Sequence, residues 1–367
     1  MLTRPKQQSE IALIGGGVIG LLTAVELAEA GFQVSLFDQG KVGQEASWAG
    51  GGILSPLYPW NYPPELLKLA FYSMSRYPAL MTRLSAQTGI DPEWMLSGLS
   101  ILHTSANPIP DQALTWAESW GLTWTRQSTD KGEALWCPEV AQVRNPRFLT
   151  LLVERCRQLG VTFHEDITVT GFQQDRDRLR GLQTTQGFFP TTQAIVTAGA
   201  WAGKLLEAIG ISLPIYPVRG QMLLLQTNLG TLNTMVMKDH RYLVPRRDGL
   251  ILVGSTSETV DFDKSVTAEA REALWNFAAE MLPGLTPAHL LRQWSGLRPG
   301  SADSIPYIGP LPGWHGLWVA AGHFRYGITN APATAEILVA MLTNSTPPLD
   351  ISPYQVIWDN GNVWVFP

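Results

Sequence analysis

The chain has 367 residues, 45% of them hydrophobic, and a formal net charge of −5 at pH 7. This length fits two domains, and an acidic chain without a Lys/Arg-rich stretch argues against a nucleic-acid partner. No run of about 20 apolar residues is present, so we expect no membrane span. Residues 1–9 lack the apolar stretch of a signal peptide, and we expect them to form a short disordered lead. Cys137 and Cys156 are too few for a disulfide framework or a metal cluster, so we expect reduced thiols, a cytoplasmic location and no metal site.

The first predicted elements are a buried strand over residues 10–14, a helix over residues 18–30 and a second strand over residues 33–37. Short apolar runs on either side of a helical segment are typical of a β-α-β unit with parallel strands. A G-x-G-x-x-G motif occupies the first strand-to-helix junction, and Asp38 ends the second strand. This combination is typical of a dinucleotide site, in which the acid accepts hydrogen bonds from a ribose diol.

Each glycine of the motif has its own expected task. Gly15 permits the tight turn, Gly17 lets the backbone approach a pyrophosphate, and Gly20 lets the helix pack closely on the sheet. The free N–H groups and the dipole at the helix N-terminus then face the phosphate charge. The motif and the acid together predict bound NAD or FAD.

Further elements follow in chain order. A loop of small residues over 43–52 implies that its backbone approaches something flat at close range. Further helices are expected over residues 65–88, 113–120, 148–159, 268–281 and 331–342. Further strands are expected over residues 101–103, 161–163, 167–170, 222–225, 242–244 and 250–253. Two more buried strands begin at Ala194 and Leu317, and each runs through small residues into a helix.

Three such strand–helix junctions, separated by blocks that look antiparallel, predict an interleaved chain of α/β and α+β class. We expect a discontinuous Rossmann-like domain from residues 1–85, 141–215 and 291–345. A sheet-rich substrate domain is expected from residues 86–140 and 216–290, and residues 346–367 are expected to form a surface tail.

These junctions, in this order, resemble the D-amino acid oxidase superfamily of flavoproteins, whose FAD-binding fold is of the GR2 (DAO) type. Within it the chain is most similar to glycine oxidases of the ThiO type. The resemblance rests on the glycine motif with Asp38 and on the segments 46–54, 239–246, 294–300, 306–309 and 321–328. The runs Gly-Leu-Arg-Pro-Gly (296–300) and Gly-His-Phe-Arg-Tyr-Gly-Ile (322–328) are more specific than the glycine motif.

The resemblance implies FAD as cofactor and oxidative deamination of glycine or a similarly small amine, with O₂ reduced to H₂O₂. It also implies a link to thiamine biosynthesis and a homotetramer. Neither cysteine lies in an expected flavin loop, and the family uses the pattern around His323 without a covalent bond, so we expect non-covalent FAD. The preferred substrate stays open among glycine, sarcosine and small D-amino acids.

The expected cofactor contacts come from the glycine motif, the second strand–helix junction and the resemblance. They are Gly15, Gly17, Val18, Ile19, Gly20, Asp38, Gln39, Ala46, Ser47, Gly51, Gly52, Ile53, Val169, Ala198, Gly199, His323, Phe324, Arg325, Tyr326, Gly327, Ile328 and Thr329. Departures from the family pattern are Asp38 in place of the commoner Glu, Tyr326 in place of Asn, Ser257 and the 55–60 loop. The last three leave the substrate preference open.

The residues themselves favour a site for an amino acid. A guanidinium holds a carboxylate through two parallel hydrogen bonds, which fixes orientation as well as charge. Arg298 is the first candidate, and an ion pair with a protein acid is the alternative; Arg325 is the second, and a surface or flavin-supporting role is its alternative. Tyr242 supplies a hydroxyl or merely packs the second sheet. His240 alternates with Tyr242 on the expected strand, so both are expected to face the flavin, His240 as a supporting or catalytic residue.

Two other functions are weighed against the oxidase. One is a flavin-dependent dehydrogenase on the same fold, acting on small D-amino acids or N-methyl amino acids with an acceptor other than O₂. The other is a non-catalytic flavin-binding subunit, which the presence of both Arg298 and Tyr242 disfavours. The interleaved nucleotide domain disfavours a plain NAD-dependent dehydrogenase.

Overall fold

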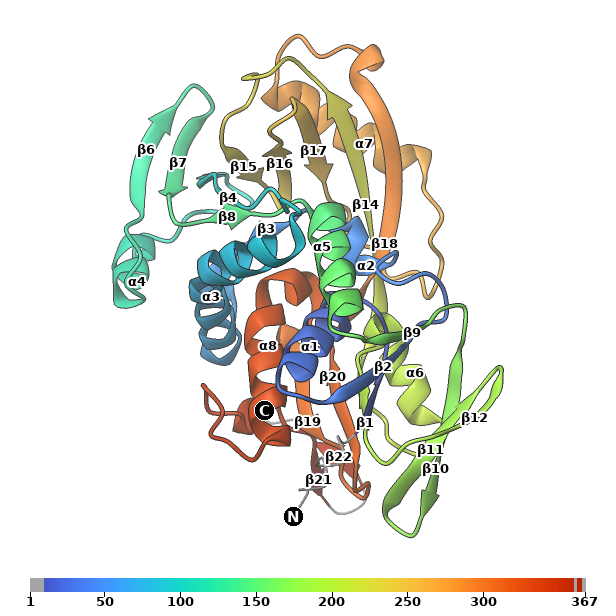
Figure 1. Cartoon of the computed structure of the whole chain (residues 1–367). Coiled ribbons are helices and arrows are strands. Elements are labelled where there is room, and N and C mark those ends of the chain that lie inside the picture. The colour runs from blue at the N-terminus through green and yellow to red at the C-terminus, as the bar shows by residue number, and fades with distance from the viewer. Residues whose placement is uncertain (1–9, 360–361, 365–367) are drawn as a thin grey trace.

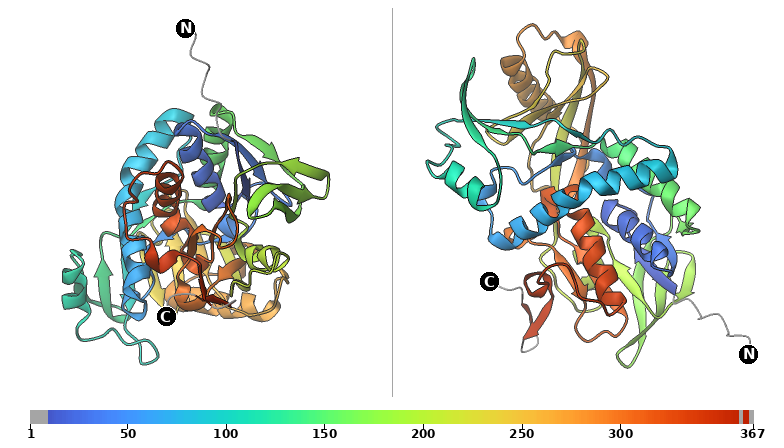
Figure 2. Two further views of the ribbon diagram at one scale, coloured as in Figure 1. Left: turned by 90° about the horizontal axis from the view of Figure 1, so that it is seen from below. Right: turned by 60° about the vertical axis from the view of Figure 1, so that its left-hand side comes forward.

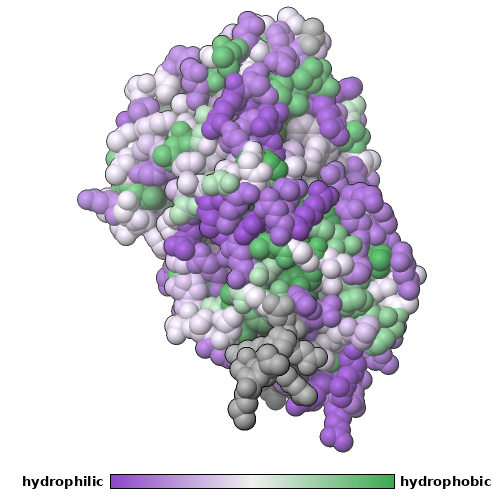
Figure 3. All heavy atoms as spheres, in the orientation of Figure 1, coloured by the Kyte–Doolittle hydropathy of each residue, from purple (hydrophilic) through white to green (hydrophobic). Residues whose placement is uncertain are grey.

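The computed structural model describes residues 10–359 and 362–364. The expected lead over residues 1–9 and parts of the expected tail, residues 360–361 and 365–367, lie outside the described residues. Within the described part, no helix is long and apolar enough to cross a membrane. Hydrophilic and hydrophobic residues are interspersed over the face shown in Figure 3.

A six-stranded sheet carries the three expected strand–helix junctions (Figure 1). In spatial order its strands are β19 (Tyr307–Pro310), β20 (Leu317–Ala321), β13 (Ala194–Val196), β1 (Glu10–Ile14), β2 (Gln33–Phe37) and β9 (Thr162–His164). All neighbours pair in parallel except β19 with β20. Ile14 lies opposite both Phe37 and Val196, and Val196 lies opposite Val319, so these strands end at one common edge. The predicted parallel arrangement is confirmed.

Helices cover one face of this sheet, and a small sheet with a short helix covers the other. The first layer holds α1 (Val18–Glu29), α3 (Pro64–Thr88), α5 (Asn145–Gln158) and α8 (Gly327–Leu342). The second holds β10 (Val169–Asp175), β11 (Arg178–Thr184), β12 (Gly187–Pro190) and α6 (Ala202–Glu207). Apolar side chains of the sheet alternate between these two layers, as a strand buried on both faces requires.

Helix α8 begins at Gly327 and not at Ala331, and α3 supports its irregular start. Pro332 has no N–H to donate to the carbonyl of Ile328, and the Tyr77 hydroxyl of α3 donates to that carbonyl instead. The N–H of Ala333 donates to Ser73 Oγ, also on α3, over 2.9 Å. Figure 2 shows α3 running across α8. The periodicity of apolar residues did not reveal this first turn because it is built from small and polar residues.

An eight-stranded sheet forms the second half of the molecule (Figure 1). Its spatial order is β18 (Leu290–Gly300), β14 (Tyr216–Gln226), β17 (Leu250–Gly254), β16 (Arg241–Pro245), β15 (Met235–Lys238), β5 (Leu99–Leu102), β7 (Gly132–Cys137) and β6 (Thr125–Thr129). Helix α7 (Ala268–Met281) packs on one face of this sheet. Met222, Tyr242 and Val244 belong to the opposite face, where they form a core with α4 (Ala113–Ser119).

A short helix, a small sheet and a C-terminal hairpin complete the described structure. They are α2 (Ala46–Ala49), the sheet of β3 (Ile53–Leu54), β8 (Ala141–Gln142) and β4 (Met95–Leu96), and the hairpin of β21 (Ile357–Asp359) and β22 (Asn362–Trp364).

The long pair β14 and β18 was largely missed by the sequence analysis, which expected a strand only over residues 222–225. Both strands have 11 residues, and they pair antiparallel with Gly220 opposite Gly296 and Pro217 opposite Pro299. Glycine and proline weaken a local strand signal, and β18 tolerates them because it is an edge strand. Helix α5 likewise begins three residues before the expected Phe148, with a proline in its first turn.

Candidate active site

A cavity of about 630 Å³ lies where the ends of the parallel strands meet the eight-stranded sheet. Its wall is formed by the β1–α1 junction, the 45–53 segment, the start of β10, the junctions after β13 and β20, and parts of β14, β16 and β18. Ligands of open α/β sheets bind in this position, and the volume is that of a ligand site.

The glycine motif is shaped by close approaches of backbone to backbone. Gly15 has a φ of +114°, and a Cβ there would collide with the carbonyl group of Thr197 at the end of β13. A Cβ on Gly20 would collide with the Gly15 carbonyl, so α1 approaches β1 more closely than a side chain permits. Gly17 lies on the cavity wall, and a Cβ there would lie 3.1 Å from Ser47 Oγ. The turn and packing tasks expected of Gly15 and Gly20 are confirmed.

Asp38 lies on the cavity wall and also holds the glycine loop in place. Its Oδ2 accepts a hydrogen bond from the Gly16 N–H over 2.8 Å, and its Oδ1 accepts one from the Gly40 N–H over 2.9 Å. Burial raises the pKa of the Asp38 carboxyl, and the two backbone N–H groups oppose this rise. Each oxygen keeps lone-pair capacity for a further donor.

The segment 46–52 presents backbone and small side chains to the cavity, as its composition predicted. Ser47 Oγ accepts from the Val18 N–H at the start of α1 over 2.9 Å. Gly52 has a φ of +74°, and a Cβ there would collide with the Val143 carbonyl. This wall of backbone and small side chains leaves room for the flat and extended FAD, and α1 begins beside it.

Arg246 at the end of β16 clamps the same segment, and the sequence analysis gave it no role. It is buried and donates to Gln142 Oε1 over 2.7 Å, to the Val143 carbonyl over 3.1 Å and to the Gly51 carbonyl over 2.9 Å. Burial lowers the pKa of Arg246 to about 10. Nothing local distinguishes such an arginine from one at the surface.

Arg298 lies in the cavity wall with neutral hydrogen-bond partners. Its Nη2 donates to Ser255 Oγ over 2.8 Å and its Nη1 donates to the Thr256 carbonyl over 3.1 Å. Gly220 makes room for the guanidinium, because a Cβ there would collide with it. Burial, and then the charge of Arg325, lowers the pKa of Arg298 to about 10. Among the described residues Arg298 forms no ion pair, so the alternative of a structural salt bridge is not found there.

Two glycines make room for the Tyr242 ring beside Arg298. A Cβ on Gly51 would lie 2.9 Å from the Tyr242 ring, and one on Gly254 would lie 2.5 Å from it. Tyr242 is buried, and its hydroxyl donates to Met222 Sδ over 3.7 Å. Sulfur is a weak acceptor that a ligand oxygen would replace favourably.

The junction after β20 supplies a second arginine and a neutral histidine. Arg325 Nη2 donates to Ser257 Oγ over 2.9 Å, and its guanidinium lies 4.8 Å from the centre of the Phe324 ring. His323 is buried, its Nε2 lies 3.0 Å from Thr334 Oγ1, and burial lowers its pKa to about 3. His323 is therefore uncharged at neutral pH and donates or accepts hydrogen bonds without contributing charge.

Besides Asp38 at the glycine loop, the departures from the family pattern are Ser257, Tyr326 and the 55–60 loop. Ser257 is the partner of Arg325, and Ser55 and Leu57 line the cavity. Tyr326 is buried on the cavity wall with its ring 5.3 Å from that of Tyr62.

Three expected site residues lie off the cavity wall. His240 lies in the turn before β16 with a φ of +64°, and its ring packs against Tyr58 at 4.9 Å. The expectation that it alternates with Tyr242 on one strand is wrong, because the strand begins at Arg241. Gly20 faces the Gly15 carbonyl, and Thr329 Oγ1 donates to the Ile53 carbonyl over 3.3 Å behind the wall. Every other residue expected to contact cofactor or substrate lines the cavity.

A mostly parallel sheet with glycine-lined junctions, opening on a cavity that contains arginines, is typical of dinucleotide-binding oxidoreductases. The family model described as "FAD dependent oxidoreductase" (DAO) matches residues 10–341. The chain therefore belongs to the DAO family of FAD-dependent oxidoreductases, and FAD is the cofactor that this membership implies.

Relatives and solved structures support the same placement. The chain is 44% identical to a glycine oxidase of Pseudomonas putida over 358 residues, covering 94% of this chain and 97% of that one. It is 32% identical to a bifunctional protein ThiO/ThiG of Synechocystis over 90% of this chain and 51% of that one. The crystal structure of glycine oxidase from Geobacillus kaustophilus superposes with a TM-score of 0.90 and 29% identity, covering 96% of this chain and all of that one.

Proposed function

We propose that this protein is an FAD-dependent oxidase of glycine or a similarly small amine such as sarcosine or a small D-amino acid. The substrate loses two electrons and two protons to give the imine, water hydrolyses the imine of glycine to glyoxylate and ammonia, and O₂ takes up the two electrons and two protons to give H₂O₂. The observation that carries the proposal is Arg298, a cation in the cavity wall whose hydrogen-bond partners are all neutral. A carboxylate is the ligand that such a guanidinium lacks.

The chain's own residues bind and orient the amino acid. Arg298 is proposed to pair with its carboxylate, Arg325 to add a second positive charge, and the Tyr242 hydroxyl to donate a hydrogen bond. The protein environment keeps these groups in place before the substrate arrives, so little ordering is left to the reaction step. When bound, FAD supplies the acceptor for the two electrons.

We propose non-covalent FAD along the glycine loop, the 46–53 segment and Val169, with the run from His323 to Ile328 around the flavin ring. Both cysteines are buried away from the cavity wall, and His323 is engaged with Thr334. The proposed domains keep the expected division, in which residues 1–85, 141–215 and 291–345 bind FAD and residues 86–140 and 216–290 bind substrate. Strand β18 connects the two, because it runs along the edge of the eight-stranded sheet to Arg298 on the cavity wall.

A cytoplasmic homo-oligomer that serves the thiazole branch of thiamine biosynthesis is proposed as its setting. Two free thiols fit a reducing compartment. The similarity to ThiO/ThiG proteins supports the pathway.

The test is aerobic incubation of the purified yellow protein with glycine, sarcosine, D-alanine and ethylamine, with hydrogen peroxide and glyoxylate as readouts. Peroxide and glyoxylate are expected in equal amounts from glycine, and ethylamine is expected to be a poor substrate. Reduction of an artificial dye by glycine without peroxide formation in air would instead support the dehydrogenase.

A further inference from the structure

The segment between β17 and α7, residues 255–267, holds both arginines of the cavity. Ser255 Oγ and the Thr256 carbonyl accept from Arg298, and Ser257 Oγ accepts from Arg325. The segment contains neither helix nor strand beyond one isolated bridge at Glu258. Its contacts with neighbouring elements, through both backbone and side chains, therefore set where these three consecutive acceptors lie.

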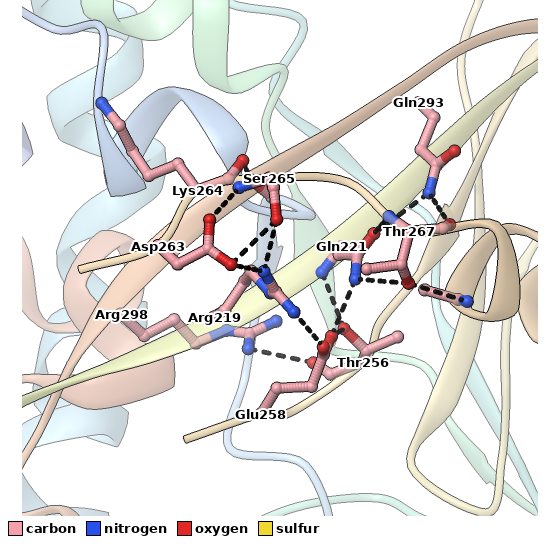
Figure 4. Close-up of polar contacts among 12 residues, drawn as sticks. Arg219, Gln221, Thr256, Glu258, Asp263, Lys264, Ser265, Thr267, Gln293 and Arg298 are labelled. Carbon is pink, nitrogen blue, oxygen red and sulfur yellow. Dashed lines mark hydrogen bonds and ion pairs between the residues drawn. The ribbon is translucent and has the colours of Figure 1, made fainter. Parts of the chain in front are cut away.

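The Arg219 side chain on β14 contacts three residues of the segment (Figure 4). The side chain is 6% exposed. Its Nη2 donates to Glu258 Oε2 over 2.7 Å, and its Nη1 donates to Asp263 Oδ2 over 2.5 Å and to Ser265 Oγ over 3.0 Å. The backbones of Arg219 and Glu258 also exchange two hydrogen bonds, of 2.8 and 2.9 Å. One buried guanidinium thus fastens the segment at two points.

The Glu258 carboxylate passes this restraint to the residue that touches Arg298. Its Oε1 accepts from the Thr256 hydroxyl and, over 3.0 Å, from Gln221 Nε2, and Thr256 Oγ1 accepts from the Gln221 N–H over 2.9 Å. Burial acts to raise the pKa of Glu258, but hydrogen bonds from Thr256 and Arg219 outweigh it and the pKa is lowered. Glu258 therefore keeps its charge at neutral pH.

Arg219 itself does not touch the cavity. Gly220 lies on the cavity wall under Arg298, whereas Arg219 and Gln221 are not on that wall. Neighbouring side chains of a strand point to opposite faces, so the network lies on the far face of β14 from Arg298. The segment 255–267 contacts both this network and the two arginines of the cavity.

We propose that Arg219 is a positioning residue for recognition of the substrate carboxylate, acting by fixing Ser255, Thr256 and Ser257 under Arg298 and Arg325. This inference rests on the proposed function. The positive charges of Arg298 and Arg325 repel each other. The two guanidinium groups can therefore face the same substrate carboxylate only while their acceptors hold them in place. Loss of Arg219 frees those acceptors and leaves Glu258 without its cation, without removing any group that contacts the ligand.

The experiment compares holoenzymes with equal FAD content: wild type, R219M, R219K and E258Q, with R83M as a matched control. Arg83 also bridges two carboxylates, those of Glu26 and Glu29, but it connects helices α1 and α3. The readouts are calorimetric binding of glycolate, which has the carboxylate and size of glycine but a hydroxyl for its amine, and KM and kcat for glycine.

R219M is expected to raise the Kd for glycolate and the KM for glycine by about tenfold, which equals about 1.4 kcal/mol, and to leave kcat within about threefold of wild type. R219K, which reaches one carboxylate at a time, is expected to restore part of the loss, and R83M to retain wild-type binding. If R219M does not fold, E258Q tests the same connection, with an expected rise of about threefold in both constants.

A lowered melting temperature with unchanged Kd and KM in R219M, or in E258Q if R219M does not fold, would show a purely structural role and overturn this inference alone. A wild-type holoenzyme that neither binds glycolate nor oxidises glycine would overturn the proposed function and this inference together.

Discussion

At the scale of single residues, the site is built from groups whose burial changes their chemistry. Arg298 and Arg246 both have a lowered pKa, yet their tasks differ. Arg246 donates hydrogen bonds to three protein acceptors, whereas Arg298 lines the cavity. His323 is the complementary case, a histidine kept neutral by burial. Such differences follow from the surroundings of a residue and not from its type.

The neutral state of His323 predicts a pH-dependent loss of stability. Its folded pKa of about 3 lies below the ordinary value of 6.5, so the unfolded chain binds the proton and folding is disfavoured as pH falls below about 6.5. At pH 5.5 this costs about 1.4 kcal/mol relative to pH 7.5. Urea unfolding of His323→Gln should show a correspondingly smaller drop between these two pH values than wild type. Equal drops in both proteins would contradict the neutral, buried histidine.

Asp38 predicts an effect on the cofactor and not on turnover. Asp38→Ala leaves the Gly16 N–H without its acceptor and loosens the glycine loop. The variant should retain less FAD after desalting, while the remaining holoenzyme turns over at nearly the wild-type rate. Asp166→Asn, which removes an exposed acid paired with Lys41, serves as the control. Full FAD retention with collapsed turnover would place Asp38 in a different role.

At the scale of elements, the three strand–helix junctions were predictable because each depends on a short run of apolar residues followed by glycine. The β14–β18 pair was not predictable, because glycines weaken the strand signal at its centre. Gly220 leaves room for Arg298 and Gly296 leaves room for Ala49, and both neighbours are distant in the sequence. The turn at His240 was also missed: Asp239 and His240 both have a positive φ, which is uncommon even for Asp and His, although these residues adopt it more often than most. Long-range contacts determine these features, and a single sequence does not display them.

Because Tyr77 of α3 supports the irregular start of α8, we expect its substitution to lower the stability of the protein. Tyr77→Phe removes the hydroxyl that replaces the missing N–H of Pro332 and leaves the partly buried Ile328 carbonyl without this donor. The free energy of unfolding should fall by about 1–3 kcal/mol. Tyr72→Phe, whose hydroxyl also reaches α8 at Glu336, should cost less because water replaces the lost partner nearer the surface. Equal losses in a denaturant titration would argue against this support of α8.

At the scale of the whole molecule, two sheets meet at one cavity, and each contributes different residues to its wall. The six-stranded sheet contributes the glycine loop and Asp38, and the eight-stranded sheet contributes Tyr242 and Arg298. The sequence patterns located nearly all of these residues, whereas Arg246 and Arg219, which hold the cavity wall from behind, emerged only from the contacts. Cofactor retention and substrate affinity should accordingly be separable by mutation.

The most direct test of this account is the KM and kcat of Arg298→Ala and Arg298→Lys holoenzymes with glycine. Loss of the partner of the substrate carboxylate should raise KM strongly and lower kcat/KM by a factor that corresponds to about 2–5 kcal/mol. Arg298→Lys should recover only part of this loss, because a point charge does not reproduce two parallel hydrogen bonds. FAD content should equal that of wild type, and the weak activity with ethylamine should hardly change. A near-normal KM for glycine in Arg298→Ala would contradict the account and transfer the carboxylate to another residue, with Arg325 the next candidate.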